Sequence, residues 1–229
     1  VDNFKESPAV FSVMIDNHED AWPQSGIDRA FLVIEAPVEA NIPRLIAFFS
    51  SGVDDVEKIG PIRSARPYFL DWAHEFDALY VHVGGSDEAL ADISVDGTFD
   101  LNQYWSDSYF WRSPKRAAPH NVYTSVEQLN RAFVQAVTRK EATTSLYGLW
   151  KFKSSTPKER VESSGITIQF EPPYRIYWQY DVNAKRYQRQ QASKAHLTED
   201  GHEIVADNVA IVITDVEILD AVGRRRVRT

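Results

Sequence analysis

Residues 13–49 read VMIDNHEDAWPQSGIDRAFLVIEAPVEANIPRLIAFF, and residues 59–68 read IGPIRSARPY. Three apolar runs within and beside this stretch, Phe11–Asp16, Phe31–Ala36 and Leu45–Phe49, have the composition of buried strands. The apolar spacing of Pro67–Phe76 is helical, and Ala78–Val83 is a continuous β-type run, typical of a strand covered on both faces. This alternation predicts an α/β (or α+β) domain with a central, mostly buried sheet and flanking helices.

Local signals predict where the helices begin. Ser64 is a possible N-cap for the helix that starts at Pro67, since proline favours the first turn. Ser86 is expected to cap a short helix over Asp87–Ile93. The clearest helix covers Thr124–Lys140, where Thr124-x-x-Glu127 has the pattern of a capping box.

The chain divides into two parts that differ in their pattern of expected helices and strands. We expect an N-terminal α/β domain over residues 1–150, a polar linker over 151–165 and a small, mostly β module over 166–229. The strands expected in the module are Ile166–Phe170, Arg175–Tyr180, Arg186–Gln190 and Val209–Val216. No finishing strand follows, so we expect the module to be incomplete, with an unpaired strand edge near Val209–Val216.

Composition excludes several classes of function. The net charge of the 229 residues is −8, and residues 1–150 alone carry 12 Lys+Arg against 22 Asp+Glu. A nucleic-acid partner is therefore not expected, because binding would need a basic face. The absence of cysteine removes disulfides, thiolate metal sites and cysteine nucleophiles. No apolar run approaches the roughly 20 residues of a membrane span. The composition does not indicate an oligomeric state.

The first residue is Val1 rather than Met, and the residues that follow it are polar. This beginning suggests processing, so a signal peptide or a lipid anchor could precede the sequence. Any attachment to a membrane is expected to be through such an anchor, outside these residues.

The strongest candidate site is a group of arginines among apolar runs. Arg63, Ser64 and Arg66 precede a helix N-terminus, where free N–H groups and guanidinium groups suit phosphate or carboxylate. Arg44 lies in a strand with apolar neighbours, so its charge needs a partner. The alternative is a structural salt-bridge network, with Arg44 on Glu35 or Glu39 and Arg63 on Asp16.

Two glycines follow the strand that ends at Val83. The order strand, Gly84, Gly85, Ser86, helix can place backbone N–H groups against a phosphate. It lacks the lysine of a Walker loop and the spacing of a dinucleotide fingerprint. The alternative is an ordinary tight turn between a strand and a helix.

Asp16-Asn17-His18 is expected at the carboxyl end of the first strand, the edge where ligands bind in open α/β sheets. Asp16 and His18 could hold a divalent ion or act as an acid–base pair, and Asp16 or Glu39 is expected as an acid–base group or as a partner of Mg²⁺, the one cofactor that the residues suggest. The alternative is that Asp and Asn simply form a turn. The His-x-x-His patterns of zinc sites are absent from the sequence, so transition-metal binding is not expected.

Trp111–Asn121 is a basic loop marked by prolines, and it follows an aromatic cluster. Its Arg112 is a further candidate ligand for an anion, if the loop closes over the site. The alternative is an exposed loop pinned by apolar anchors. No Gly-x-Ser-x-Gly elbow is present, which argues against a hydrolase triad.

Several of these motifs resemble the YerB-type family of predicted bacterial lipoproteins, which pair an N-terminal domain of unknown function with a smaller C-terminal domain. The resemblance is carried by Pro23–Gly26, Ala36–Glu39, Ile59–Tyr68 and Val81–Ser86, and by Tyr187-x-Arg189 and Asp207–Val209 in the second part. Asn41 and Pro43 depart from the glycine and threonine expected before Arg44. The resemblance implies an extracytoplasmic, lipid-anchored protein and no established reaction.

A second, weaker resemblance is to the LytR-CpsA-Psr envelope phosphotransferases, which hold a polyprenyl pyrophosphate with arginines and aspartate. Three hypotheses follow. The protein could bind an anionic small molecule or an envelope polymer precursor, it could be a Mg-assisted phosphotransferase acting on a lipid-linked precursor, or it could be a protein-interaction module whose arginines are structural.

Overall fold

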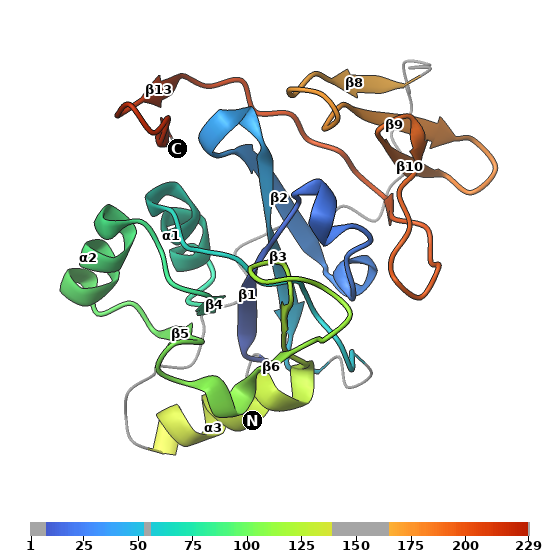
Figure 1. The fold of residues 1–229 in the computed structure, drawn as a ribbon. Helices are drawn as coiled ribbons and strands as arrows, with labels where there is room; N and C mark the ends of the chain where they lie inside the picture. The colour runs from blue at the N-terminus through green and yellow to red at the C-terminus, as the bar shows by residue number, and fades with distance from the viewer. Residues whose placement is uncertain (1–7, 53–55, 139–164, 229) are drawn as a thin grey trace, which may run out of the picture.

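The structure is a computed structural model of the chain, and it describes residues 8–52, 56–138 and 165–228 (Figure 1). The expected linker over 151–165 lies outside the described residues, apart from Gly165. The last two residues of the helix expected up to Lys140 lie outside them too.

A five-stranded mixed sheet forms the centre of the N-terminal part, in the order β2-β3-β1-β4-β5. β1 pairs with β3 in antiparallel fashion and with β4 in parallel fashion, so it is the central strand. The strands are β1 (Val10–Ile15), β2 (Leu32–Pro37), β3 (Pro43–Ser50), β4 (Leu79–His82) and β5 (Asp100–Asn102). The strands expected from the sequence are confirmed, while the short β5 has too little apolar pattern to be predicted.

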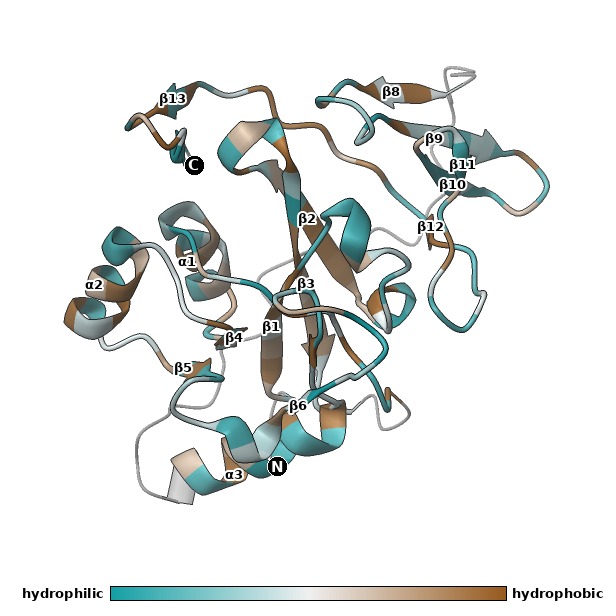
Figure 2. Cartoon of the chain, in the orientation of Figure 1, coloured by the Kyte–Doolittle hydropathy of each residue, from teal (hydrophilic) through white to brown (hydrophobic). Residues whose placement is uncertain are grey.

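The sheet is covered on both faces, which gives three layers. In β1 the alternate residues Phe11, Val13 and Ile15 pack in one core cluster with side chains of α3 (Val126–Thr138). Val10 and Met14 point to the other face, in a cluster with residues of α1 (Pro67–His74) and α2 (Asp87–Asp96). All six residues of β1 are therefore buried, and the central strands are brown in Figure 2. The predicted fold class of this part is confirmed.

The helix starts match the sequence signals in part. Ser86 caps α2, because its Oγ accepts a hydrogen bond from the N–H of Ala89. Arg66, not Ser64, is the N-cap residue of α1, with Pro67 in the first turn. At the start of α3, the Oγ of Ser125 accepts from the N–H of Gln128. The predicted cap Thr124 instead donates to the carbonyl of Tyr109.

The C-terminal part is mostly β, as predicted. A hairpin of β9 and β10 is extended by β8 on one side, and β11 and β12 pair with β10. These strands are β8 (Ile166–Ile168), β9 (Ile176–Asp181), β10 (Arg186–Gln191), β11 (Lys194–Ala195) and β12 (Val205–Ala206).

The strand expected over Val209–Val216 is wrong for most of its length. Residues 207–215 form an irregular connector that crosses from β12 to the hairpin of β13 (Val216–Ile218) and β14 (Arg225–Val227) (Figure 1). Ile211, Val212 and Ile213 are exposed, so their apolar character reflects no packing among the described residues. Val227 of β14 joins the core cluster that contains α1 and α2.

A buried polar seam joins the two parts. Arg189 of β10 donates to both carboxylate oxygens of Glu35 at 2.8 and 2.9 Å. Next to this pair, Gln191 Nε2 donates to Asn17 Oδ1 at 2.9 Å, and a ring nitrogen of His196 lies 2.8 Å from Gln24 Oε1. The C-terminal part is thus held against the residues that follow β1 and β2.

The remaining elements are short. They are the hairpin strands β6 (Trp111–Arg112) and β7 (Val122–Tyr123), and the 3-10 turns η1 (Glu19–Ala21), η2 (Ile27–Arg29), η3 (Glu39–Asn41) and η4 (Asp107–Tyr109). Among the described residues, no helix combines the length and the apolar character that crossing a bilayer requires.

Candidate functional site

The candidate site lies at one end of the central sheet, where β1 ends and β3 begins. Ile15 of β1 pairs with Leu45 of β3, so Asp16 and Arg44 emerge at the same edge. The chain returns to this edge at Arg63, whose N–H donates to the carbonyl of Met14 at 2.9 Å. The backbone therefore brings together groups that are far apart in the sequence, at the edge that the sequence indicated.

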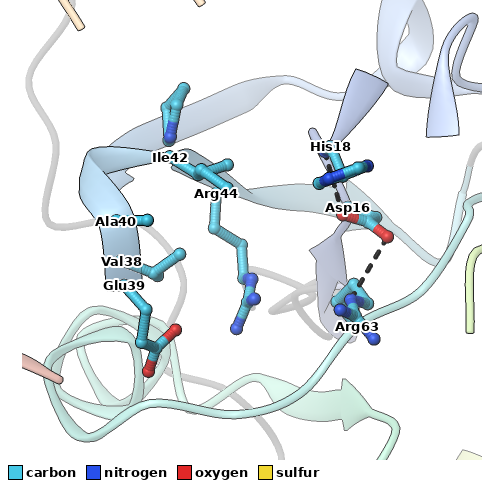
Figure 3. A pocket seen from close by; sticks show the side chains of 9 residues that line it. Asp16, His18, Val38, Glu39, Ala40, Ile42, Arg44 and Arg63 are labelled. Atoms are coloured by element: carbon cyan, nitrogen blue, oxygen red, sulfur yellow. Dashed lines mark hydrogen bonds and ion pairs between the residues drawn. The ribbon is translucent and has the colours of Figure 1, made fainter. Parts of the chain in front are cut away.

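A cavity of about 190 Å³ opens between these segments (Figure 3). Figure 3 shows the Arg44 guanidinium between Glu39 on one side and Asp16 and Arg63 on the other. The lining residues are Asp16, His18, Val38, Glu39, Ala40, Ile42, Pro43, Arg44 and Arg63.

Ala40 and Asn41 shape one wall of the cavity with an unusual backbone. Their φ angles are 54° and 55°, in the left-handed region that L-residues seldom adopt. The glycine expected at position 41 from the family pattern would suit this conformation, and asparagine is among the residues that tolerate it best.

Arg44 is buried, with 7% of its surface exposed, and its Nη1 donates to the carbonyl of Ser64 at 3.0 Å. No carboxylate of the described residues lies within ion-pair distance of it. The expected partners are engaged elsewhere, Glu35 by Arg189 and Glu39 by Arg66. Burial, together with the charges of Arg66 and Arg63, lowers the pKa of Arg44 to about 10, so the group still carries its charge at neutral pH.

Arg66 is paired closely, and its contacts are structural. Its Nε and Nη2 donate to the two carboxylate oxygens of Glu39 at 2.7 and 2.9 Å, a bidentate pair. Burial alone would raise the pKa of Glu39, but the hydrogen bonds and the charge of Arg66 outweigh it and hold the pKa below its ordinary value. Arg66 does not line the cavity, in contrast to the prediction that it contacts the ligand.

Arg63 and His120 share the buried carboxylate of Asp16. Arg63 Nε lies 3.2 Å from Asp16 Oδ2 without the alignment of a hydrogen bond, and His120 Nδ1 lies 2.6 Å from the same oxygen. The two Nη groups of Arg63 have no acceptor among the described residues. The structural pair expected between Arg63 and Asp16 is therefore present, yet it leaves Arg63 with donors to spare.

The charges around the cavity do not balance. Three guanidinium groups, Arg44, Arg63 and Arg66, face the two carboxylates of Asp16 and Glu39. Asp16 is paired with Arg63 and Glu39 with Arg66, so the excess positive charge is that of Arg44. A buried cation in a cavity, in a chain of net charge −8, is the feature of this site that internal pairing does not explain.

Gly84, Gly85 and Ser86 lie outside the cavity. The N–H of Gly84 donates to Asn102 Oδ1 at 3.1 Å, and the N–H of Ser86 donates to the carbonyl of Ala65 at 3.3 Å. Because these donors are used within the protein, the geometry fits the tight-turn alternative better than a phosphate cradle.

Two other predicted ligands are also separated from the cavity. Arg112 donates to Asn121 Oδ1 at 2.9 Å and to Gln103 Oε1 at 3.0 Å. Ser64 contributes its carbonyl to Arg44 and does not line the cavity. The structure thus brings together Asp16, Glu39, Arg44 and Arg63, and leaves the other predicted ligands outside.

Sequence reasoning missed His120 and Asp20, which join His18 beside the cavity. The His18 and His120 rings stack with centroids 4.8 Å apart. The basic loop does pack against the site, because Arg116 donates to the carbonyls of Asp20 and Trp22 at 3.1 Å each. A histidine in a proline-marked loop beside arginines was the available signal, but nothing in its spacing pointed to Asp16.

Comparison with known proteins identifies the class. The family described as "Protein of unknown function (DUF3048) N-terminal domain" matches residues 2–140, and its C-terminal domain family matches residues 166–229. The chain therefore belongs to this two-domain family, and the predicted YerB-type resemblance is confirmed.

One relative, YerB of Bacillus subtilis, is similar to this chain both in sequence and in solved structure. The chain is 33% identical over 222 residues to "Putative lipoprotein YerB" of Bacillus subtilis (strain 168), covering 93% of this chain and 65% of that protein. The crystal structure of YerB from Bacillus subtilis has a TM-score of 0.79 and 28% identity, covering 99% of this chain and 76% of that one. The chain thus spans just under two thirds of the curated relative's length.

Proposed function

We propose that this protein binds a small anionic group, a phosphate or a carboxylate, in the cavity lined by Arg44 and Arg63. The observation that carries the proposal is the buried Arg44 guanidinium without a carboxylate partner among the described residues. An unpaired buried charge is costly to a fold, whereas a bound anion would compensate it.

The donors around the cavity fit such a ligand. One N–H group of Arg44 donates to the carbonyl of Ser64, and Arg63 Nε lies 3.2 Å from Asp16 Oδ2. The remaining N–H groups of two planar guanidinium groups are suited to bidentate contacts with phosphate or carboxylate oxygens. The excess positive charge beside an otherwise acidic surface would select an anion for this position.

The cavity limits how much of the ligand is enclosed. A volume of about 190 Å³ is smaller than the roughly 300–1,000 Å³ of clefts that enclose most of a drug-sized ligand. That is room for one anionic head group, so the rest of a larger molecule would extend outside. The ligand class that we infer is therefore an anionic small molecule or the charged end of an envelope polymer precursor.

The proposed location is extracytoplasmic, on a lipid anchor outside the given residues. It rests on the name of the Bacillus subtilis relative, which is called a lipoprotein, and on the family resemblance. A cell-envelope component is the natural source of a phosphorylated or carboxylated ligand in that location.

A phosphotransferase helped by Mg²⁺ is the alternative that shares this site. It would need Asp16 or Glu39 as an acid–base group or metal ligand. Both Glu39 oxygens accept from Arg66, and Asp16 Oδ2 is shared by Arg63 and His120. These contacts favour binding over catalysis for the two carboxylates. The interaction-module alternative accounts for Arg66 and Arg189 but leaves the cavity at Arg44 without a role.

The test is isothermal titration of the purified chain with inorganic phosphate, pyrophosphate and acetate. Arg44→Met is expected to weaken binding by about 10- to 100-fold, since a charge-assisted hydrogen bond contributes about 1.5–3 kcal/mol. Arg112→Met is the matched control, because Arg112 lies outside the cavity, and it should bind as the unaltered chain does. Failure of all three anions to bind, or equal binding by Arg44→Met, would refute the proposal.

A further inference from the structure

Two loops bring a second group of chemically distinctive side chains together beside the arginine cavity. His18 and Asp20 follow β1, and His120 comes from the loop before β7, about a hundred residues later. One ligand atom from each of the three residues lies within 4.8 Å of the others. Two imidazoles and a carboxylate are a donor set typical of zinc and similar divalent ions.

The two distances to the Asp20 carboxylate approach those of a coordination sphere. Asp20 Oδ2 lies 3.4 Å from His18 Nδ1 and 3.9 Å from His120 Nε2. Ligands about 2.0–2.2 Å from a tetrahedral ion lie roughly 3.3–3.5 Å apart. The Asp20 side chain is 69% exposed, so it is free to make the small movement that closes the set.

Asp16 supplies the contact that metal-binding histidines usually make with their other ring nitrogen. Its Oδ2 lies 2.6 Å from His120 Nδ1, and since an ionised carboxylate can only accept, we assign the proton to this nitrogen. The lone pair of His120 is then on Nε2, the atom that faces Asp20. A buried carboxylate that fixes the tautomer and the ring orientation is a hallmark of histidine ligands.

The backbone around the three residues is held in place. Arg116 ties the loop of His120 to the carbonyls of Asp20 and Trp22. His18 Nδ1 already points at the same small region, where it accepts a hydrogen bond from the N–H of Asp20 at 3.2 Å. A bound ion would coordinate the lone pair of His18 Nδ1 and would replace the exposed hydrogen bond from the N–H of Asp20.

We propose that His18, Asp20 and His120 bind a divalent transition-metal ion of the zinc class, with Asp16 as the positioning residue for His120. The sequence alone did not indicate a transition-metal site, because it has no His-x-x-His pattern. Three protein ligands leave one tetrahedral position open. His18 also lines the arginine cavity, so the metal site lies beside that cavity, and the metal proposal does not depend on the anion proposal.

The test uses the untagged chain with Zn²⁺ alone, and Co²⁺ as a spectroscopic probe, without any anionic ligand. We expect one equivalent of Zn²⁺ to bind, and Co²⁺ to give the absorption bands of a tetrahedral site with imidazole ligands. His18→Ala and His120→Ala should abolish both signals, and Asp20→Asn should weaken binding at least tenfold. Asp16→Asn should weaken it by about 10- to 100-fold.

The control is His202→Ala, because His202 lies 3.1 Å from Asp28 in a pair that has no third His, Cys, Asp or Glu donor close to it among the described residues. This variant should bind Zn²⁺ as the unaltered chain does. Asp20→Asn changes an exposed side chain, so its fold is expected to persist, and circular dichroism verifies this. Absence of stoichiometric binding, or equal binding by His18→Ala and His120→Ala, would overturn the proposal.

Discussion

Arg189 and Arg44 are both buried arginines, and their surroundings differ in one respect. Arg189 crosses the seam between the two parts of the chain and meets both oxygens of Glu35. It also contacts Gln191 and His196, so its donors are used. Arg44 donates to one backbone carbonyl, that of Ser64, and lines the cavity. The comparison separates a buried arginine with a carboxylate partner from one that has no carboxylate partner among the described residues.

The largest effect is expected at the seam. Arg189→Met would leave Glu35 with a weakened set of partners in a partly buried position, and breaking a buried pair costs about 3–5 kcal/mol. We therefore expect a loss of this size in the free energy of unfolding, measured by urea denaturation. The control is Arg186→Met, whose side chain is 46% exposed and lies 3.6 Å from Asp207. Exposed pairs contribute at most about 1 kcal/mol, so equal losses in both variants would contradict the comparison.

The seam is also expected to weaken in mild acid through His196. Burial, reinforced by the charge of Arg189, lowers the pKa of His196 well below its ordinary value of 6.5. Between the folded pKa and 6.5 the unfolded chain binds more protons, so stability is full above 6.5 and falls as the pH drops below it. The slope should approach about 1.4 kcal/mol per pH unit, measured by urea denaturation at several pH values.

Two variants test whether His196 causes the loss of stability below pH 6.5. His196→Gln should flatten the dependence just below pH 6.5, whereas the exposed His202→Gln should keep it. The carboxylates of Glu39 and Glu199, whose pKa values are lowered from 4.5, lose their contributions only below that value. A slope below pH 6.5 that persists in His196→Gln would place the effect elsewhere.

The smallest effect on stability is expected at Arg44. Replacing an unpaired buried charge by an apolar side chain of similar length is often neutral or stabilising, so Arg44→Met should leave the free energy of unfolding unchanged or raise it by about 1 kcal/mol. Arg66→Met is the matched variant, since it removes a bidentate partner from Glu39 and should cost about 2 kcal/mol. Thermal and urea unfolding without added anions measure both. A loss at Arg44 as large as that at Arg66 would show that Arg44 is structural.

Much of the fold was predictable because it depends on local pattern. The strands β1 to β4, the helix after Pro67 and the cap at Ser86 follow from apolar periodicity and from short-range hydrogen bonds. The prediction over Val209–Val216 was wrong because an apolar β-type run forms a strand only where another strand pairs with it. Capping of α3 also depended on tertiary neighbours. The Thr124 hydroxyl donates to the carbonyl of Tyr109, and Ser125 accepts the capping hydrogen bond in its place.

The candidate site was predictable in place but not in composition. Asp16 was expected at a strand end, and Arg44 and Arg63 were expected to meet an anion, because guanidinium groups among apolar residues need partners. The partners themselves are set by contacts across many residues. Glu39 forms an ion pair with Arg66, and Glu35 forms one with Arg189 of the C-terminal part. His120 is hydrogen-bonded to Asp16, which lies 104 positions earlier in the sequence.

The sequence by itself determined the strands β1 to β4 and the helices, the two-part organisation, the family and the edge of the sheet where charged groups gather. Only the tertiary structure decided which arginine is left without a carboxylate and which histidines and aspartate share a donor set. The physical reason is that periodicity and capping act within a few residues, whereas ion pairing and ligand geometry depend on chain segments that meet only after folding.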